Sequence, residues 1–161
     1  MTDQPNDVAA EQAALGGCML SRDVASDISE LLRPEDFFTP RHTLIYESIL
    51  RLLLSGAPTD AIAVVDDLIS RGELQRAGGA DYVHHLTSCV PVAVQAPYHA
   101  GIVSEKAVRR RVLGVAATIQ ASLQTGEVND LIEAARSGLD KAAGLQRQAL
   151  TYVGDLIEEV V

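Results

Sequence analysis

The sequence predicts an all-α fold, and three observations support that prediction. Hydrophobic residues make up 47% of the 161 residues, but aromatic ones only 4%, which favours helices packed through aliphatic side chains over a sandwich or barrel. Apolar residues recur at steps of three and four, the period of amphipathic helices. Capping residues, Pro and Gly stand where these stretches begin and end. We expect a compact globule of about six helices, followed by an antiparallel helical hairpin and the start of a linker helix.

The chain divides into four expected segments. Residues 1–7 are expected to form a flexible N-terminus, 8–96 a helical globule, 97–145 the hairpin, and 146–161 a linker with the start of its helix. The linker begins with a polar stretch after Gly144, near which the second hairpin helix is expected to end.

The first helix is expected over about 8–20, with Asn6 and Asp7 as capping residues. Gly16 and Gly17 lie within it, where glycine lowers helix stability. A close contact with another helix at this point would compensate for that loss, and we therefore expect one.

The remaining helices of the globule have their own boundary signals. Ser21 can cap a second helix that Pro34 ends, and Thr39 followed by Pro40 is typical of a helix start. The other expected boundaries are Gly56 for the end of the third helix, Pro58-Thr59-Asp60 and Gly72 for the fourth, and Pro91 after a short fifth helix that contains Tyr82, Val83 and Leu86. On the fourth helix, Ile62, Val65, Leu68 and Ile69 are expected to line one face.

The hairpin is predicted by two long apolar periodicities separated by a short turn. One helix runs from about Pro97 to Gln124, and Asn129 can cap its partner after Thr125-Gly126. A turn of about four residues makes the two helices antiparallel. Each helix has more apolar width than the other can cover, so the surplus indicates self-association. The residues that we expect to mediate it are Val108, Val112, Leu113, Val115, Ile119, Leu123, Leu131, Ala135 and Leu139.

Charge and cysteine usage restrict the function classes. The net charge is −9, and residues 1–96 hold 6 Lys and Arg against 14 Asp and Glu. Such an acidic globule repels phosphate, which argues against tight DNA binding. Cys18 and Cys89 form no CxxC pair and are expected to be small buried residues in a reducing compartment. The polar N-terminus lacks the pattern of a signal peptide, so we expect a soluble cytoplasmic protein without a membrane partner.

The sequence supplies no pattern of catalytic, cofactor-binding or metal-binding residues. It lacks the phosphate-binding pattern GxxxxGK[ST], and neither Glu-x-x-His nor HExxH occurs. His84 and His85 are adjacent and point to different sides of a helix, whereas His42 and His99 stand alone. The sequence therefore gives little support to the hypothesis that the chain is an enzyme built on a helical bundle.

One basic run, formed by Lys106 and Arg109-Arg110-Arg111, could contact a partner. Three consecutive Arg spread over more than half of a helix circumference and cannot all face one molecule. Solvation and pairing with local carboxylates such as Glu105 is the favoured interpretation. Docking of an acidic helix and weak contact with DNA are the alternatives.

The order of several short motifs resembles the N-terminal domain of the bacterial replicative DNA helicase (DnaB) family over about residues 8–145. Residues 10–17 resemble the AEQxxLGG opening of the family, and Val92-Ala93-Val94-Gln95 departs from the family's usual Thr-Ala-Ala-Asn-type turn. The other matching segments are Asp36-Phe37-Phe38 with Arg41-His42 and Ile45-Tyr46, Gly56-x-Pro58-x-Asp60, Gly72-x-Leu74, Gly78-Gly79 with Tyr82, Tyr98-x-x-x-Ile102-Val103-x-Glu105-Lys106, and Arg110-Arg111.

The resemblance implies a non-catalytic collar domain. In the family, hairpins pair between subunits of a hexamer, and the collar receives the C-terminal helical domain of primase and, in some systems, a helicase loader. By position, Tyr82, Leu113 and Ile119 resemble residues that face primase, although each can equally be a core or seam residue. ATP and Mg²⁺ would bind only in a separate motor domain, and residues 150–161 resemble the start of the linker helix that leads to it. A stand-alone helical adaptor that modulates helicase or primosome assembly is the alternative function.

Overall fold

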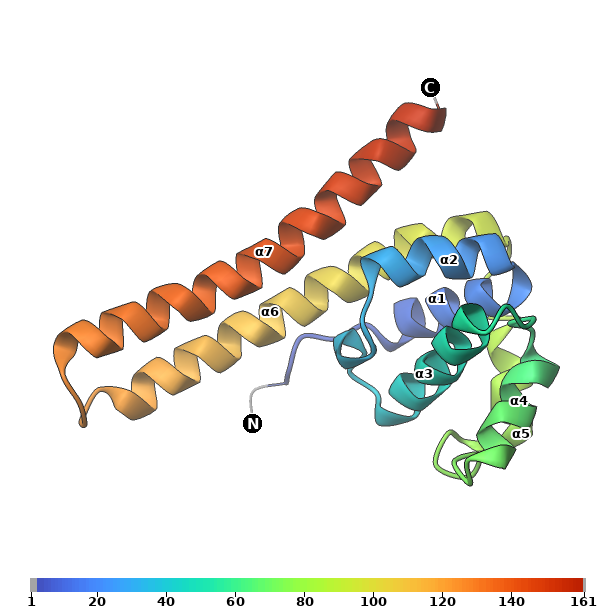
Figure 1. Ribbon diagram of the computed structural model, residues 1–161, viewed down its shortest axis with the longest axis horizontal. Helices are drawn as coiled ribbons and strands as arrows, with labels where there is room; N and C mark the ends of the chain where they lie inside the picture. The colour runs from blue at the N-terminus through green and yellow to red at the C-terminus, as the bar shows by residue number, and fades with distance from the viewer. Residues whose placement is uncertain (1–2, 161) are drawn as a thin grey trace.

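The computed structural model describes the backbone of residues 3–160 and the side chains of residues 3–144. The described residues form seven α-helices and two short 3₁₀ helices, which confirms the predicted all-α class (Figure 1). The elements are α1 (Val8–Leu20), α2 (Arg22–Leu31), η1 (Pro34–Asp36), α3 (Pro40–Leu54), α4 (Ala61–Ser70), α5 (Gly79–Leu86), η2 (Ala93–Gln95), α6 (Ala96–Ser122) and α7 (Val128–Val160).

Helix α1 lies at the centre of the globule and packs against α2, α3, α5 and α6. It can do so because its small residues allow close approach. A Cβ atom on Gly16 would collide with the carbonyl oxygen of Leu86, and one on Gly17 with the Cβ of Ala96. The close contact predicted at this glycine pair is therefore confirmed, and it involves both α5 and the start of α6.

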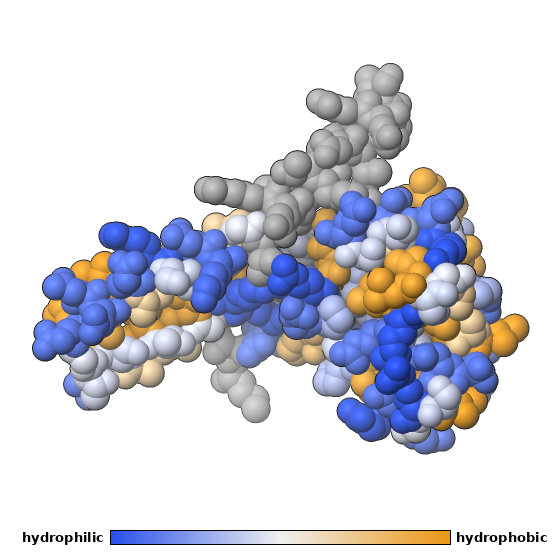
Figure 2. Space-filling model, in the orientation of Figure 1, coloured by the Kyte–Doolittle hydropathy of each residue, from blue (hydrophilic) through white to orange (hydrophobic). Residues whose placement is uncertain are grey.

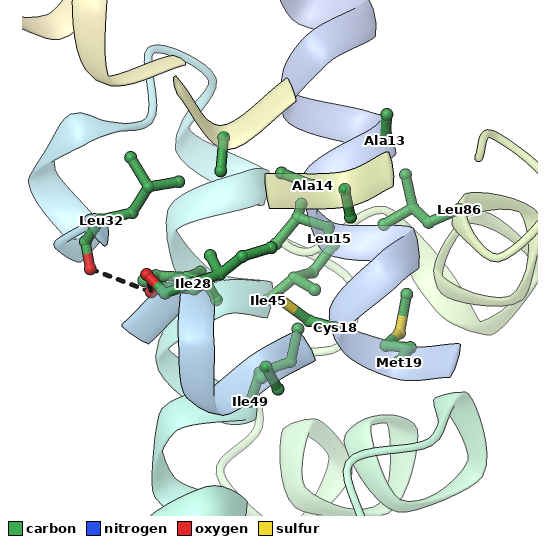
Figure 3. Close-up of a cluster of buried hydrophobic side chains, with 14 of the residues drawn as sticks. Ala13, Ala14, Leu15, Cys18, Met19, Ile28, Leu32, Ile45, Ile49 and Leu86 are labelled. Atoms are coloured by element: carbon green, nitrogen blue, oxygen red, sulfur yellow. Dashed lines mark hydrogen bonds between the residues drawn. The ribbon is translucent and has the colours of Figure 1, made fainter. Parts of the chain in front are cut away.

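The core beside α1 is built mainly from aliphatic side chains, together with Cys18, Met19, Phe37 and the phenol of Tyr46; part of it is drawn in Figure 3. The hydroxyl of Tyr46 donates a hydrogen bond of 2.9 Å to the carbonyl oxygen of Leu32, which provides its polar atom with a partner inside the core. Burial raises the pKa of Cys18 to about 12, as expected for a thiol that serves as a small apolar residue.

Three predicted helix caps are confirmed by side-chain hydrogen bonds. Asp7 accepts from the backbone N–H of Ala10, Ser21 from that of Val24, and Asp60 from the first turn of α4. The carbonyl of Pro5 accepts a hydrogen bond from Arg110. The Pro5 carbonyl thus contacts α6, and the Asp7 side chain contacts the first turn of α1. Flexibility of the N-terminus stays an expectation, and residues 1–2 lie outside the described residues.

The predicted apolar face of α4 is only partly the buried face. Val64 and Leu68 are fully buried, whereas Ile62 and Ile69 are exposed. The prediction was wrong for these two isoleucines because α4 is apolar on several sides. Periodicity alone cannot then decide which side meets the core.

Helix α6 belongs to both parts of the molecule. Its first half packs against α1 and α2, and Ala100, Val103 and Ala107 are part of the buried interior. Its second half extends beyond the globule and packs against α7 alone at the far end of the hairpin (Figure 1). The chain boundary expected at 96/97 coincides with the start of α6, but the side chains of the helix extend the globular core to about Val108.

The second hairpin helix is longer than predicted. Helix α7 starts at Val128, where the backbone carbonyl of Glu127 accepts the first hydrogen bond, so Asn129 is not its cap. The helix then runs without a break past Gly144 to Val160. The expected helix end near Gly144 is wrong because one glycine costs a helix only about 1 kcal/mol, which the neighbouring turns can offset. Side chains of 145–161, including the expected amphipathic segment from Leu150, lie outside the described residues.

Candidate self-association and docking surface

The hairpin residues predicted to mediate self-association fall into three groups. Val108 is buried at the base of the hairpin, where α6 leaves the globule. Four half-buried residues lie in the seam between the helices, and four are exposed. The seam residues are Val115, Ile119, Leu131 and Ala135, and the exposed residues are Val112, Leu113, Leu123 and Leu139.

The seam is tight because α7 presents small residues to α6. A Cβ atom on Gly138 would lie 3.0 Å from a methyl carbon of Val115. On one side the helices leave an apolar groove with a volume of about 420 Å³. The groove is lined by Arg111, Gly114, Val115, Thr118, Ile119, Ser122, Leu131, Ala134, Ala135 and Gly138.

The exposed aliphatic face of the hairpin is larger than the predicted set. Val128 is 67% exposed and Ile132 51%, and both lie on the α7 face that also carries Leu139. Apolar side chains appear along both hairpin helices in Figure 2. We define the outer aliphatic face as the exposed residues Val112, Leu113, Leu123, Val128, Ile132 and Leu139. Within a single copy, these side chains are 40–67% exposed, and large exposed apolar patches mark interaction sites in soluble proteins.

The three residues singled out for primase docking do not form one site in a single copy. Leu113 is exposed on α6, and Ile119 lies in the seam. Tyr82 belongs to α5, which lies in the globule at the opposite end of the molecule from the hairpin turn (Figure 1). Any surface that contains all three must therefore be assembled from more than one chain, or the partner must be extended.

Tyr82 is part of a polar network that sequence reasoning missed. Its hydroxyl lies 2.6 Å from Nε2 of His42 and accepts a hydrogen bond from Gln12. The guanidinium of Arg41 stacks over its ring at 3.9 Å. On the other side of the imidazole, Nδ1 lies 2.6 Å from a carboxylate oxygen of Glu11. His42 therefore does not stand alone, and it links α1, α3 and α5.

Glu11 is buried yet charged, because its oxygens are well supplied with donors. They accept hydrogen bonds from His42 and from the backbone N–H groups of Phe38 and Thr39. Burial alone would raise the pKa of this carboxyl, but the bonds from His42 and Phe38 outweigh it, and the net pKa is lowered. No motif in the sequence links Glu11 with a histidine 31 residues away, so pattern reading could not have found the pair.

The basic run is mostly engaged within the chain. Arg109 pairs with Glu105 on the solvent side of α6, as the favoured interpretation predicted. Arg110 donates to the carbonyl oxygens of Pro5 and Asp36, and Arg111 forms an ion pair with the Asp36 carboxylate. Burial lowers the pKa of both guanidinium groups. Arg110 and Arg111 are thus engaged within the chain in this conformation. Contact of the basic run with an acidic helix or with DNA stays a prediction.

Within the described residues, no cluster of His, Cys, Asp and Glu has the arrangement of a metal site. The search of those residues for a helix long and apolar enough to cross a membrane also finds none.

Comparison with known proteins identifies relatives that share this arrangement. Residues 3–105 match the model of the DnaB-like helicase N terminal domain family. A replicative DNA helicase DnaB of Leifsonia xyli subsp. xyli is 46% identical over 164 residues, which cover 96% of this chain and 36% of that protein. For a replicative DNA helicase DnaB of Mycobacterium leprae, the identity is 50% over 109 residues, 68% of this chain and 18% of the relative. The chain thus spans about a third or less of these relatives.

A solved structure extends the likeness to the fold. The crystal structure of the N-terminal domain of DnaB helicase from Mycobacterium tuberculosis superposes with a TM-score of 0.81 and is 40% identical in sequence. The match covers 86% of this chain and 99% of the other. The likeness therefore includes much of the hairpin as well as the globule.

Proposed function

We propose that this chain, which belongs to the family of DnaB-like helicase N-terminal domains, is the collar-forming part of a replicative DNA helicase. In this role the chain is non-catalytic. It pairs with copies of itself through the hairpin, contributes to a ring, and offers a docking surface to the C-terminal helical domain of primase and to a helicase loader in the cytoplasm. Hydrolysis of ATP and unwinding of DNA would belong to a motor domain that follows in the same protein.

The exposed outer aliphatic face supports this proposal most directly. Leu123 and Val128 are 65% and 67% exposed on either side of the hairpin turn, and large aliphatic residues in such a cluster are costly to leave in water. Their helices already use a separate seam to hold the hairpin together. The outer residues are therefore free to bind another chain without loss of the hairpin itself.

The absence of a charge barrier on the hairpin is consistent with pairing of identical copies. Residues 97–161 hold 7 Lys and Arg against 8 Asp and Glu, whereas the preceding segment is strongly acidic. Two copies that meet through the hairpin avoid the repulsion that contact between acidic globules would bring. Electrostatic repulsion is therefore weaker when two copies associate through their hairpins than when they associate through their globules.

Light scattering after size-exclusion chromatography tests the self-association. The wild-type chain should form dimers or larger assemblies as its concentration rises. Leu113→Asp should raise the dissociation constant about tenfold to a hundredfold, the effect of losing about 1.4–2.8 kcal/mol at an apolar contact. Ser137→Asp, an exposed polar position on α7 that is two residues from Leu139 and so points away from this face, is the control and should leave the assembly unchanged.

A seam variant separates assembly from hairpin folding. Leu131→Asp places a charge between α6 and α7 and should lower the helical signal in circular dichroism, whereas Leu113→Asp should not. A wild-type chain that stays monomeric at high concentration, with Leu113→Asp indistinguishable from it, would overturn the proposal. Primase docking is tested separately by titrating a labelled C-terminal domain of primase with the wild type and with Leu113→Asp.

A further inference from the structure

The hairpin leaves the globule at a point where three segments distant in sequence meet. These are the N-terminal residues 5–7, the turn 36–38 and the α6 residues 110–111. Arg110 and Arg111 make all the polar contacts of α6 to the other two segments that the structure records here. We propose that these two arginines are positioning residues that fix the direction in which the hairpin leaves the globule.

Arg110 and Arg111 contact different acceptor groups. Arg110 places Nη1 2.6 Å from the carbonyl oxygen of Pro5 and Nη2 2.5 Å from that of Asp36, and its guanidinium lies 5.5 Å from the centre of the Phe38 ring. Arg111 pairs with Oδ1 of Asp36. A planar guanidinium donates to the two acceptors from two different nitrogens, whereas the single nitrogen of a lysine would have to approach both acceptors itself.

The turn that the arginines hold is itself rigid. The second carboxylate oxygen of Asp36 accepts a hydrogen bond of 2.8 Å from the backbone N–H of Arg33. Glu11 of α1 accepts the backbone N–H groups of Phe38 and Thr39. Asp36 is 4% exposed, so its charge needs the guanidinium for compensation. The arginines therefore anchor α6 to a turn that the globule holds in place.

The contacts of Arg110 and Arg111 lie at the point where α6 leaves the core of the globule. The buried positions of α6 end at Val108, and the second half of the helix extends away from the globule beside α7 (Figure 1). Gly114 lies three residues after Arg111, with no neighbouring atom within 4 Å of a Cβ built on it, and glycine is a weak point in an exposed helix. Loss of the contacts of Arg110 and Arg111 would lengthen the part of α6 that the globule does not hold, which would then begin after Val108.

One other contact opposes a change in the direction of the hairpin. Helix α7 also packs on α2. Apolar packing between two helices supplies no directional bond. The proposal therefore predicts that the arginines, rather than this packing, hold the orientation. If the packing suffices, removal of the arginines will leave the orientation unchanged.

A distance measurement between spin labels tests the proposal without relying on self-association. Labels at Ser70→Cys on the globule and Gln120→Cys on the free half of α6 occupy exposed positions. Cys89→Ser removes a competing thiol, and buried Cys18 should not be labelled. Dilution with unlabelled protein restricts the signal to distances within one chain. Pulsed electron paramagnetic resonance then reports the orientation of the hairpin relative to the globule.

Adjacent arginines provide the matched comparison. Arg110→Gln and Arg111→Gln should each broaden the distance distribution and shift its mean, whereas Arg109→Gln, which loses only an exposed pair with Glu105, should match the wild type. Arg111→Lys keeps the ion pair and should restore the narrow distribution. A narrow distance distribution in Arg111→Lys, together with an unchanged distribution in Arg109→Gln, would show that the positive charge at position 111 sets the orientation of the hairpin. Circular dichroism verifies that each variant is folded.

Distributions of Arg110→Gln and Arg111→Gln that superimpose on the wild type would overturn the proposal. If Arg111→Gln does not fold, Arg110→Gln decides the question by the same criterion. The consequence for assembly rests on the proposed function: Arg111→Gln should raise the dissociation constant of the dimer about tenfold, equivalent to one lost contact. A monomeric wild type would refute the proposed function alone, because the label distances still test whether Arg110 and Arg111 fix the direction of the hairpin.

Discussion

Nδ1 of His42 lies 2.6 Å from a carboxylate oxygen of Glu11, and both side chains are shielded from solvent. The pair joins α1 to α3, and the hydroxyl of Tyr82 extends it to α5. A carboxylate can only accept, so Nδ1 carries the proton in this contact. The buried polar network thus fixes the relative positions of three helices beside the candidate docking residue.

The charge of Glu11 makes a contribution to stability that depends on pH. Its folded pKa lies below its ordinary value of 4.5, so the contribution is fully present above pH 4.5 and is lost as the pH falls through the folded pKa. Glu11→Gln should lower the free energy of unfolding by about 1–3 kcal/mol at pH 7, the cost of a disrupted buried network. The difference from the wild type should shrink as the pH falls below 4.5.

Chemical denaturation of both proteins at several pH values measures this difference. The comparison cancels the effect of other carboxylates with a lowered pKa, such as Asp67 beside Arg51. A difference between the two proteins that does not shrink as the pH is lowered below 4.5 would show that Glu11 is not the titrating group.

Gly16 and Gly17 allow α1 to approach its neighbours closely. Alanine at either position places a methyl group on the backbone of α5 or on Ala96 of α6, and we expect a loss of about 1–3 kcal/mol from overpacking. Gly101→Ala is the matched control, because its Cβ would have no neighbour within 4 Å. It should stabilise the protein by about 0.5–1 kcal/mol, since alanine favours the helix. Thermal unfolding of the three variants tests the prediction, and equal effects would contradict it.

The hydroxyl of Tyr82 has a structural role that can be separated from docking. Tyr82→Phe retains the ring beneath Arg41 but removes the bond to His42, so we expect it to cost about 0.5–1.5 kcal/mol of stability. Tyr98→Phe, at a position that is 74% exposed, should change stability little. If Tyr82→Phe is destabilised but binds the primase domain normally, the ring rather than the hydroxyl faces the partner.

The two cysteines should differ in reactivity. Burial raises the pKa of Cys18 to about 12, so almost none of this thiol is ionised at pH 8, and the thiolate is the reactive form. Cys89 is half-buried. A thiol reagent should therefore modify one cysteine in the native protein and two in denaturant. Modification of two cysteines at similar rates under native conditions would mean that the core around Cys18 opens readily.

Local signals in the sequence determined the secondary structure well. Asp7, Ser21 and Asp60 cap the helices that they were expected to cap, because a capping bond joins residues only two or three positions apart. The close contact at Gly16 and Gly17 was also predictable, since glycine within a helix needs a compensating reason. The same local rules failed at Gly144, where a single weak residue was interpreted as a helix end.

Tertiary structure alone decided which side chains meet. Glu11 and His42 are 31 residues apart, and Asp36 and Arg111 are 75 apart; a pairing at such separation leaves no periodic trace in one sequence. The same holds for α4, where Ile62 and Val64 are equally apolar but only Val64 is buried. Helix propensity and capping act between neighbours along the chain, so the sequence determined them. The direction of the hairpin and the members of the buried networks depend on contacts between distant segments, which exist only once the helices have packed.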